Sequence, residues 1–318
     1  MNVSTAQGPN LAIFNRRTYR VSTWYGLKNL AANGVGALLS PLGVVVLLAR
    51  EQEGLLPLIL FVGYFGYRAQ FVLHDASHRF LFPNAKLGDM VATVVGATVG
   101  VVFGQYKRNH LLHHRNTGRP TDPQYLDFAA PDSSASAYLR FCFAPLWGGR
   151  LFPYLKRELA PLFKPRKRMA GHDAGGLQAT GSEDRRTSSA PIALLILFHA
   201  IFSLSCLIVA SNLFIACVAL GFFYGSLGTL SLALARWRGV AEHQTYSEPL
   251  LDFSRNHAPS LFDRLTLSGS NFNFHLTHHL YPTLPPQYLR QVTQSEGLPI
   301  TSTSMFSTLS EQFRLRLK

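Results

Sequence analysis

The sequence predicts an all-α integral membrane protein: four transmembrane helices in two hairpins, a short re-entrant or interfacial helix, and a cytoplasmic helical cap. Three observations support this fold class. Of the 318 residues, 47% are hydrophobic and only 15% are charged, well below the ~25% charged residues of a soluble domain. Four stretches are long and almost entirely apolar. The net charge is nevertheless +13, which indicates basic loops beside apolar membrane segments.

The four apolar stretches are the expected membrane spans. The first pair covers 30–49 and 55–73, and the second pair covers 190–210 and 213–235. A helix of roughly twenty residues, at ~1.5 Å per residue, matches the ~30 Å hydrocarbon core of a bilayer. Short polar turns separate the members of each pair, so each pair is expected to form a hairpin. A further apolar segment, 90–104, is short for a full span and is expected to be re-entrant or interfacial.

The remaining sequence suggests the domain organisation. We expect a basic N-terminal arm at 1–29, a membrane domain at 30–290 and a C-terminal tail at 291–318. Within the membrane domain, a flexible basic loop is expected at about 164–190, where a Gly/Ser-rich stretch lies between clusters of Lys and Arg. The N-terminal arm lacks the apolar stretch of a cleavable signal peptide, so none is expected.

Cysteine usage and charge argue against several classes of function. Cys142, Cys206 and Cys217 form no Cys-x-x-Cys pair, which leaves a zinc knuckle, a cysteine-ligated iron–sulfur centre and a thioredoxin-type motif without support. A nucleic-acid partner would suit the positive charge. The apolar stretches are too long for a soluble fold of this size, however, so no nucleic-acid partner is expected.

Histidines form three clusters, and these are the strongest functional signal. Eight of the twelve histidines lie in His74–His78, His110–His114 and His275–His279. The last two clusters place histidines at i, i+3 and i+4, and the first at i and i+4. On a helix these positions share one face, so we expect the three imidazoles of a cluster to converge on one point. Eight imidazoles exceed the needs of one ion, which favours two metal ions.

The positive-inside rule places all three clusters on one side of the membrane. If the basic N-terminal arm is cytoplasmic, the first hairpin returns His74 and His78 to that face. If 90–104 does not cross, the second cluster stays there. The second hairpin then returns the chain after Arg236 to the same side. We therefore expect every cluster at the cytoplasmic face.

Other polar residues have open interpretations. His243 follows the fourth span and is either a ninth ligand or a surface side chain. Asn271 and Asn273 flank the last cluster, where an amide oxygen can bind the cofactor or cap a helix. Asp75 either orients an imidazole through its other ring nitrogen or is solvated. The three remaining histidines are not expected to be ligands. His172 lies in the basic loop and His257 in a loop. His199 lies inside the third span, where it is either a hydrogen-bonded interior histidine or one that faces a substrate channel.

The ligand chemistry favours redox work with dioxygen. The chain contains neither Glu-x-x-His nor His-Glu-x-x-His, so a carboxylate-rich di-iron bundle and a zincin-type protease have no support. Histidine-bound ions keep their positive charge and can support more than one oxidation state. A membrane metal transporter is the alternative from another class. It predicts ionisable residues within the spans, where Arg68 and His199 are nearly alone.

The motifs HDASH, HLLHH and HLTHH, in this order and with membrane hairpins around them, resemble the membrane fatty-acid desaturase superfamily. Its members carry HxxxH, HxxHH and HxxHH boxes. The resemblance runs from about residue 55 to 290. It includes the Arg-Gly-Val-Ala-Glu-His stretch at 238–243 and the stretch from Asn271 to Pro282.

The resemblance implies a non-haem di-iron oxidoreductase that uses dioxygen and two external electrons to remove hydrogen from an unactivated C–H bond. A double bond in a fatty acyl or lipid-like chain is the expected product; hydroxylation or ketone formation on a lipid or specialised metabolite is the alternative. No fused haem motif is present, which implies an external ferredoxin or small cytochrome as the electron donor. The implied iron ligands are His74, His78, His110, His113, His114, His243, His275, His278 and His279.

Overall fold

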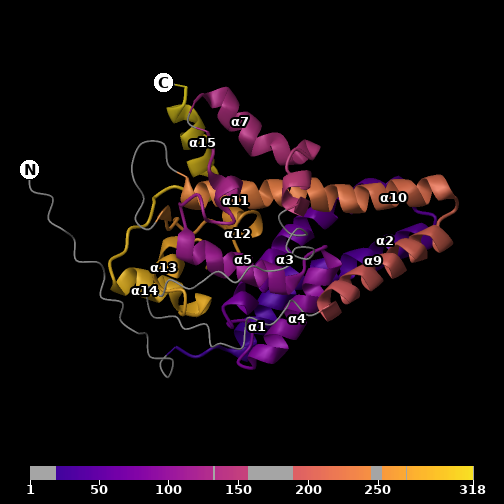
Figure 1. Ribbon diagram of the computed structural model, residues 1–318, viewed down its shortest axis with the longest axis horizontal. Coiled ribbons are helices and arrows are strands. Elements are labelled where there is room, and N and C mark those ends of the chain that lie inside the picture. The colour runs from indigo at the N-terminus through magenta and orange to yellow at the C-terminus, as the bar shows by residue number, and fades with distance from the viewer. Residues whose placement is uncertain (1–18, 132, 157–188, 245–252, 270, 318) are drawn as a thin grey trace, which may run out of the picture.

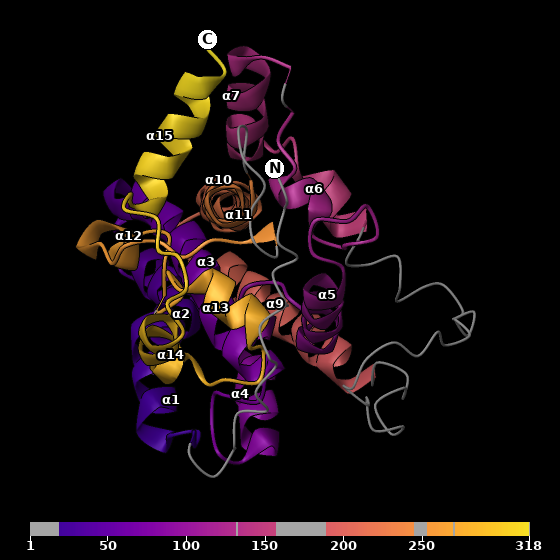
Figure 2. The ribbon, with the colours of Figure 1, turned by 90° about the vertical axis from the view of Figure 1, so that its left-hand side faces the viewer.

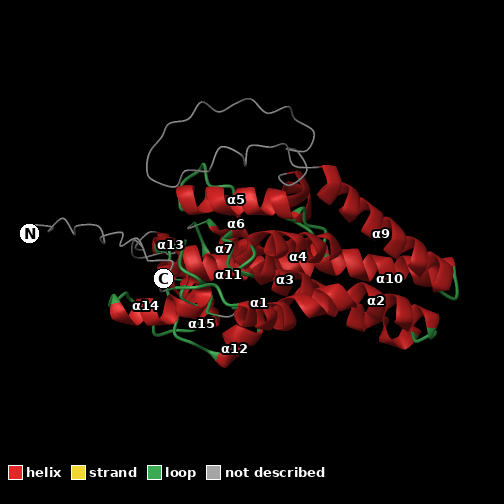
Figure 3. Ribbon diagram, turned by 90° about the horizontal axis from the view of Figure 1, so that it is seen from below, coloured by secondary structure: helices red, strands yellow, loops and turns green. Residues whose placement is uncertain are grey.

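The computed structural model describes residues 19–131, 133–156, 189–244, 253–269 and 271–317. These residues form helices and turns without a β-strand (Figure 3). Two isolated β-bridges, Asn256–Phe274 and His257–Thr301, pair short extended segments of the described chain. The prediction of an all-α membrane fold is confirmed, because four helices are long and apolar enough to cross a membrane.

The first hairpin is built from two long helical segments. Thr23–Ala49 is the first span, and consists of α1 (Thr23–Asn29), a π-helical turn (Leu30–Gly34) and α2 (Val35–Ala49). Glu53–Ser77 is the second span, and consists of a 3₁₀ turn (Glu53–Leu60) and α3 (Phe61–Ser77). Helix thus begins at Thr23 rather than Leu30. The second span ends inside the first histidine cluster.

The second hairpin contains the other two spans. Its helices are α9 (Ser189–Val209), α10 (Leu213–Ser226) and α11 (Leu232–His243), with a π-helical turn between the last two. Asn212 caps α10 by accepting a 3.0 Å hydrogen bond from the backbone N–H of Ile215. Ser211 donates a hydrogen bond to Glu53, so both hairpin turns lie at the same end of the molecule (Figure 1).

Large apolar side chains on the spans face outward. Exposed examples are Leu42 on α2, Ile196 and Ile208 on α9, and Phe214 on α10, which is 73% exposed. In water such a surface would be strongly unfavourable, whereas in a bilayer it contacts hydrocarbon. The outward side chains and the length of the helices agree on an integral membrane protein.

The expected short helix at 90–104 is one arm of a bent pair. α4 (Ala85–Thr98) and α5 (Phe103–Asn116) meet at 106°, so the chain does not continue as one straight span. Gly100 lies in this bend with φ +76°, a conformation that glycine adopts without strain. A Cβ atom on Gly96 would lie 2.7 Å from the Val101 carbonyl oxygen. The two glycines therefore permit the sharp bend, which supports the re-entrant or interfacial interpretation.

The remaining helices cover the ends of the spans opposite the hairpin turns (Figures 1 and 2). We call this group the cap. It comprises α5, α6 (Tyr125–Phe128), α7 (Ala135–Phe143), α12 (Leu261–Leu265), α13 (His275–Leu280), α14 (Leu289–Ser295) and α15 (Met305–Leu315). The expected C-terminal tail therefore contains most of α14 and all of α15. The expected basic loop lies largely outside the described residues.

α3 joins the membrane helices to the cap. Tyr67 and Phe71 are fully buried and pack against Leu267, Phe272 and Met305. The Tyr67 hydroxyl donates to the Leu267 carbonyl. On the same helix, Arg68 donates to the carbonyls of Arg264 and Ser268, at 2.7 and 2.9 Å. These contacts fix the end of α3 relative to the cap.

We expect Gly96→Ala to destabilise the protein by about 1–3 kcal/mol, because the added methyl group must displace the Val101 carbonyl. Thermal unfolding in detergent measures the effect. Gly43→Ala is the matched control, since a Cβ atom there meets nothing within 4 Å. Equal melting temperatures for the two variants would contradict the role assigned to the bend.

Candidate metal centre

Four helices bring nine histidines together at the junction of the spans and the cap. His74 lies in the last turn of α3, and His78 is its C-terminal cap residue. α5 carries the second cluster and α13 carries the third. His243 is the last residue of α11, and its ring lies among the others. Seven of the nine are buried, and His78 and His114 are half-buried.

The nine histidines form two groups, and each group draws on several helices. The first group consists of His74, His78, His110, His114 and His278; the second consists of His113, His243, His275 and His279. Within each group, the possible ligand atoms all lie within 4.8 Å of one another. Each group could therefore hold one metal ion.

The expectation that each i, i+3, i+4 triad converges on one point is wrong. His110 and His114 belong to the first group, whereas His113 belongs to the second. The triad of α13 is divided in the opposite way: His278 belongs to the first group, whereas His275 and His279 belong to the second. Positions i and i+4 differ by about 40° around a helix, while i+3 and i+4 differ by about 100°. Each helix therefore directs its i+3 histidine to one site and its i, i+4 pair to the other.

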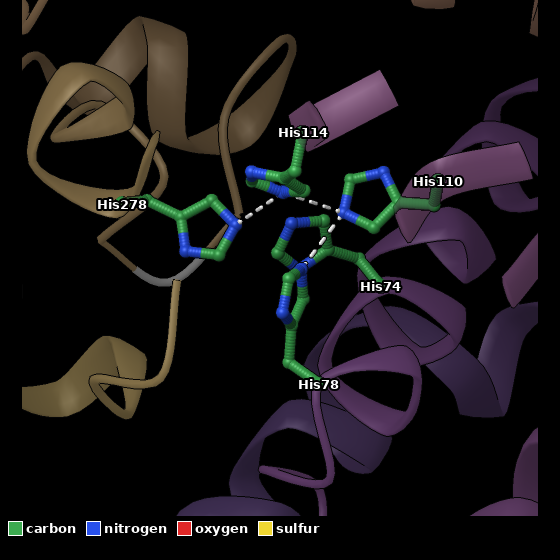
Figure 4. Close-up of side chains that lie close together, drawn as sticks. All are labelled: His74, His78, His110, His114 and His278. Atoms are coloured by element: carbon green, nitrogen blue, oxygen red, sulfur yellow. Dashed lines mark hydrogen bonds between the residues drawn. The ribbon is translucent and has the colours of Figure 1, made fainter. Parts of the chain in front are cut away.

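Ring nitrogens in the first group are in close contact (Figure 4). His110 Nε2 lies 2.9 Å from His78 Nε2 and 3.1 Å from His114 Nε2. His114 Nε2 also lies 3.1 Å from His278 Nε2. His74 Nε2 is buried and has no hydrogen-bond partner. In the second group, His275 Nε2 lies 3.0 Å from the Nε2 atoms of both His243 and His279.

These spacings fit nitrogens that surround a cation. A neutral imidazole nitrogen carries either one hydrogen or one lone pair, so a chain of such atoms cannot be satisfied by ordinary hydrogen bonds alone. Two nitrogens bound at right angles to one ion, at the ~2.0–2.1 Å typical of zinc–imidazole bonds, lie ~3 Å apart. The observed contacts of 2.9–3.1 Å agree with this value.

Several histidines have an oxygen atom close to Nδ1, the ring nitrogen that faces away from the group. Asp122 Oδ2 lies 2.8 Å from His113 Nδ1, and Thr117 Oγ1 lies 3.2 Å from His279 Nδ1. The Phe253 carbonyl oxygen lies 2.9 Å from His243 Nδ1. An acceptor at Nδ1 fixes the tautomer that leaves the Nε2 lone pair free for a metal. Sequence reasoning missed Asp122 and Thr117, which stand in a turn without periodicity.

Asp75 acts in the same way and is anchored in the first span. It is fully buried, so the solvated interpretation is wrong. Its Oδ1 lies 3.3 Å from His74 Nδ1. Its Oδ2 accepts hydrogen bonds from the Tyr25 hydroxyl at 2.9 Å and from Asn29 Nδ2 at 2.5 Å. Tyr25 and Asn29 are therefore polar residues of a membrane span that orient a histidine.

Burial keeps the histidines in the neutral form that binds metals. It lowers the pKa of His78 to about 3. It also holds the pKa values of His275, His278 and His279 well below their ordinary range. Burial disfavours the charged form of an imidazole, and a ring whose pKa lies well below 7 is neutral at pH 7, so these rings offer lone pairs rather than positive charge.

Asn271 and Asn273 both precede α13, and their side-chain amides bind backbone carbonyls of other segments. Asn271 has φ +65°, which asparagine tolerates, and donates from Nδ2 to the Pro286 carbonyl at 3.1 Å. Asn273 Nδ2 donates to the His257 carbonyl at 3.0 Å. Contact of these amides with a cofactor stays a prediction.

The three histidines outside the clusters have different surroundings. His257 is fully buried, and its ring nitrogens lie 3.1 Å from the Ala241 carbonyl oxygen and 3.3 Å from that of Thr303. It is therefore a structural residue of the segment that supports α13. His199 Nδ1 lies 3.2 Å from the Tyr224 hydroxyl, between α9 and α10. His172 lies outside the described residues.

A cavity of about 130 Å³ reaches the histidines from between α3, α5 and α11. His74, His110, His243 and His275 are among the residues that line it. Its wall also contains Phe128 and polar side chains such as Arg150. A substrate that enters this cavity would meet ring nitrogens of both groups.

Apolar spans and histidine boxes at their ends define a membrane oxidoreductase of the histidine-box type. The chain belongs to the fatty acid desaturase family, whose sequence pattern matches residues 54–304. It is also similar to the Delta 8-(E)-sphingolipid desaturase of Komagataella phaffii (strain GS115 / ATCC 20864), with 26% identity over 125 residues. This match covers 38% of the chain and only 22% of that relative. No solved structure matches the chain.

Asp122→Asn should weaken metal binding by about 10–100-fold, because the amide removes the charge that orients His113. Metal content and affinity of the purified protein measure the change. Asp89→Asn is the control, since Asp89 is 44% exposed and pairs with Lys107 rather than with a histidine. A wild-type metal affinity in Asp122→Asn would contradict the orienting role.

Proposed function

We propose that the protein is a dioxygen-dependent, non-haem di-iron oxidoreductase that introduces a double bond into a fatty acyl or related lipid-like chain. One observation carries this proposal: two groups of histidine nitrogens converge at the ends of two membrane hairpins in a member of the fatty acid desaturase family. Imidazole is a suitable ligand for iron. Lipid substrates reach such a position within the bilayer.

The nine histidines would hold two iron ions, five with the first group and four with the second. When bound, the ions would supply the activation of dioxygen that hydrogen removal from an unactivated C–H bond requires. The protein contributes position and protection. Asp75 and Asp122 orient His74 and His113, and the apolar spans exclude water from the hydrocarbon chain.

The proposed substrate is a hydrocarbon chain that enters the cavity beside α3, α5 and α11. The sphingolipid desaturase named above acts, by its name, on a lipid. That similarity supports a lipid-like substrate for this chain. Desaturation and hydroxylation differ in how the substrate chain lies relative to the oxidant. The polar side chains of the cavity wall would help to set that position.

The proposed orientation places the histidines at the cytoplasmic face. The spans end at the cap on one side and at two short turns on the other. The net charge of +13 favours a cytoplasmic location for the basic loops. Electrons would come from a separate ferredoxin or small cytochrome, and a basic surface would attract an acidic donor.

His278→Ala should lower turnover by more than about 100-fold, because loss of a ligand exceeds the ~10–100-fold cost of losing an outer partner. Turnover in membranes measures activity, and extraction behaviour measures membrane insertion, which should be unchanged. His172→Ala is expected to keep wild-type activity. Substantial turnover by His278→Ala would count heavily against the di-iron site.

Product analysis tests the reaction itself. Lipids and metabolites of cells with and without the protein are compared by mass spectrometry. Loss of two hydrogen atoms supports desaturation, and gain of one oxygen atom supports hydroxylation. Purified protein should contain about two irons per chain, as the two groups imply. Tight zinc binding without oxygen consumption would instead favour a metal-binding or transport protein.

A further inference from the structure

Glu242 is a buried carboxylate beside the second histidine group. It directly precedes His243 at the end of α11, and 3% of its side chain is exposed. Its Oε1 accepts a 2.8 Å hydrogen bond from Arg238 Nε, one turn earlier on the helix. Its Oε2 lies 3.6 Å from His275 Nε2. The guanidinium thus fixes one oxygen, while the other faces a nitrogen of the second group.

Glu242 differs from the other carboxylates near the histidines. Among the described residues, Asp75 and Asp122 contact Nδ1 atoms, on the outer side of the rings. Glu242 instead approaches an Nε2 atom, and the Nε2 atoms are those that converge within each group. A carboxylate can reach a cation held by the rings from this inner side only.

The two groups also differ in their number of nitrogens, and Glu242 would add a ligand to the smaller group. The first group offers five nitrogens and the second offers four. Imidazole ligands are neutral, so an ion held by them alone keeps its full charge in a buried site. Uncompensated buried charge is strongly unfavourable. The group with fewer nitrogens is the one that has a carboxylate within 3.6 Å of a ring nitrogen.

Arg238 holds this carboxylate from a fixed position. Its guanidinium carbon lies 4.9 Å from the ring centroids of both Phe71 and Phe272. Both Arg238 and Glu242 line the cavity that reaches the histidines. Carboxylates that bind metals are commonly hydrogen-bonded through their other oxygen, which is the arrangement that Arg238 provides.

We infer that Glu242 is a metal ligand of the second group, bound through Oε2 while Arg238 holds Oε1. The inference rests on the proposed function, because it requires iron in the histidine groups. The set of atoms within 4.8 Å of one another does not include Glu242, so the carboxyl group must turn toward His275 when the ion binds. Mixed imidazole and carboxylate ligands are typical of non-haem iron.

The test is anaerobic titration of the purified full-length protein with ferrous iron. The wild type should bind about two ions per chain. Glu242→Gln should keep one site and weaken the other by more than about tenfold, because the amide retains the shape and the bond to Arg238 but loses the charge. Glu296→Gln, at an exposed position, is the matched control and should bind iron as the wild type does.

Arg238→Gln distinguishes a ligand from a packing partner. If Glu242 is a ligand, Arg238→Gln weakens the second site less than Glu242→Gln does, since the carboxylate remains. If Glu242 only pairs with Arg238, both variants weaken that site equally, which overturns the inference. Thermal unfolding without iron controls for folding. If Glu242→Gln does not fold, Glu242→Asp replaces it, and an unchanged second site in that variant overturns the inference.

The iron titration also separates this inference from the proposed function. A wild type that binds two ions, with Glu242→Gln binding both at equal affinity, overturns the ligand role alone. A wild type that binds no iron overturns the di-iron function and the ligand role together. Adding Glu242→Gln to His113→Ala, which removes a nitrogen of the second group, should cause little further loss of iron.

Discussion

Convergence of nine imidazole nitrogens is the constraint on which the rest of the structure depends. Nitrogens buried in contact at 2.9–3.1 Å cannot all satisfy one another, so the surrounding structure must hold them together. The support is extensive. Asp75 and Asp122 fix rings on α3 and α5. Asn256 holds the short helix α13 by accepting from the Thr277 backbone N–H at 3.1 Å. Isolated helices of this length are unstable, so such contacts determine where its histidines lie.

The membrane helices take a direct part in shaping the site. Tyr25 and Asn29 extend polar groups from the first span to Asp75, and Arg68 on α3 binds carbonyls of the cap. Polar groups within a span are costly unless they are paired. Here each has a partner that belongs to the site or to its support. The spans therefore anchor the protein in the bilayer and also position the histidines.

The sequence predicted the spans, the short re-entrant or interfacial segment and the histidine clusters, because hydrophobic length and helical spacing are local properties. The composition of the two groups could not be predicted in this way. Helical spacing separates His113 and His278 from the other members of their clusters, but tertiary packing decides which histidines of other helices they join. Asp122 and Thr117 were missed because they act from a turn. His257 was expected in a loop, and its burial depends on distant carbonyls of Ala241 and Thr303.

α5 and α13 each contribute histidines to both groups, and this sharing has a consequence for biogenesis. Each group takes at least one histidine from α13, which follows both hairpins along the chain. Neither site is complete while the hairpins are being inserted. A nascent chain that has made only the hairpins therefore lacks histidines of both groups. The order of the clusters along the chain thus delays assembly of both groups until the segment after the second hairpin has been made and has folded onto the spans.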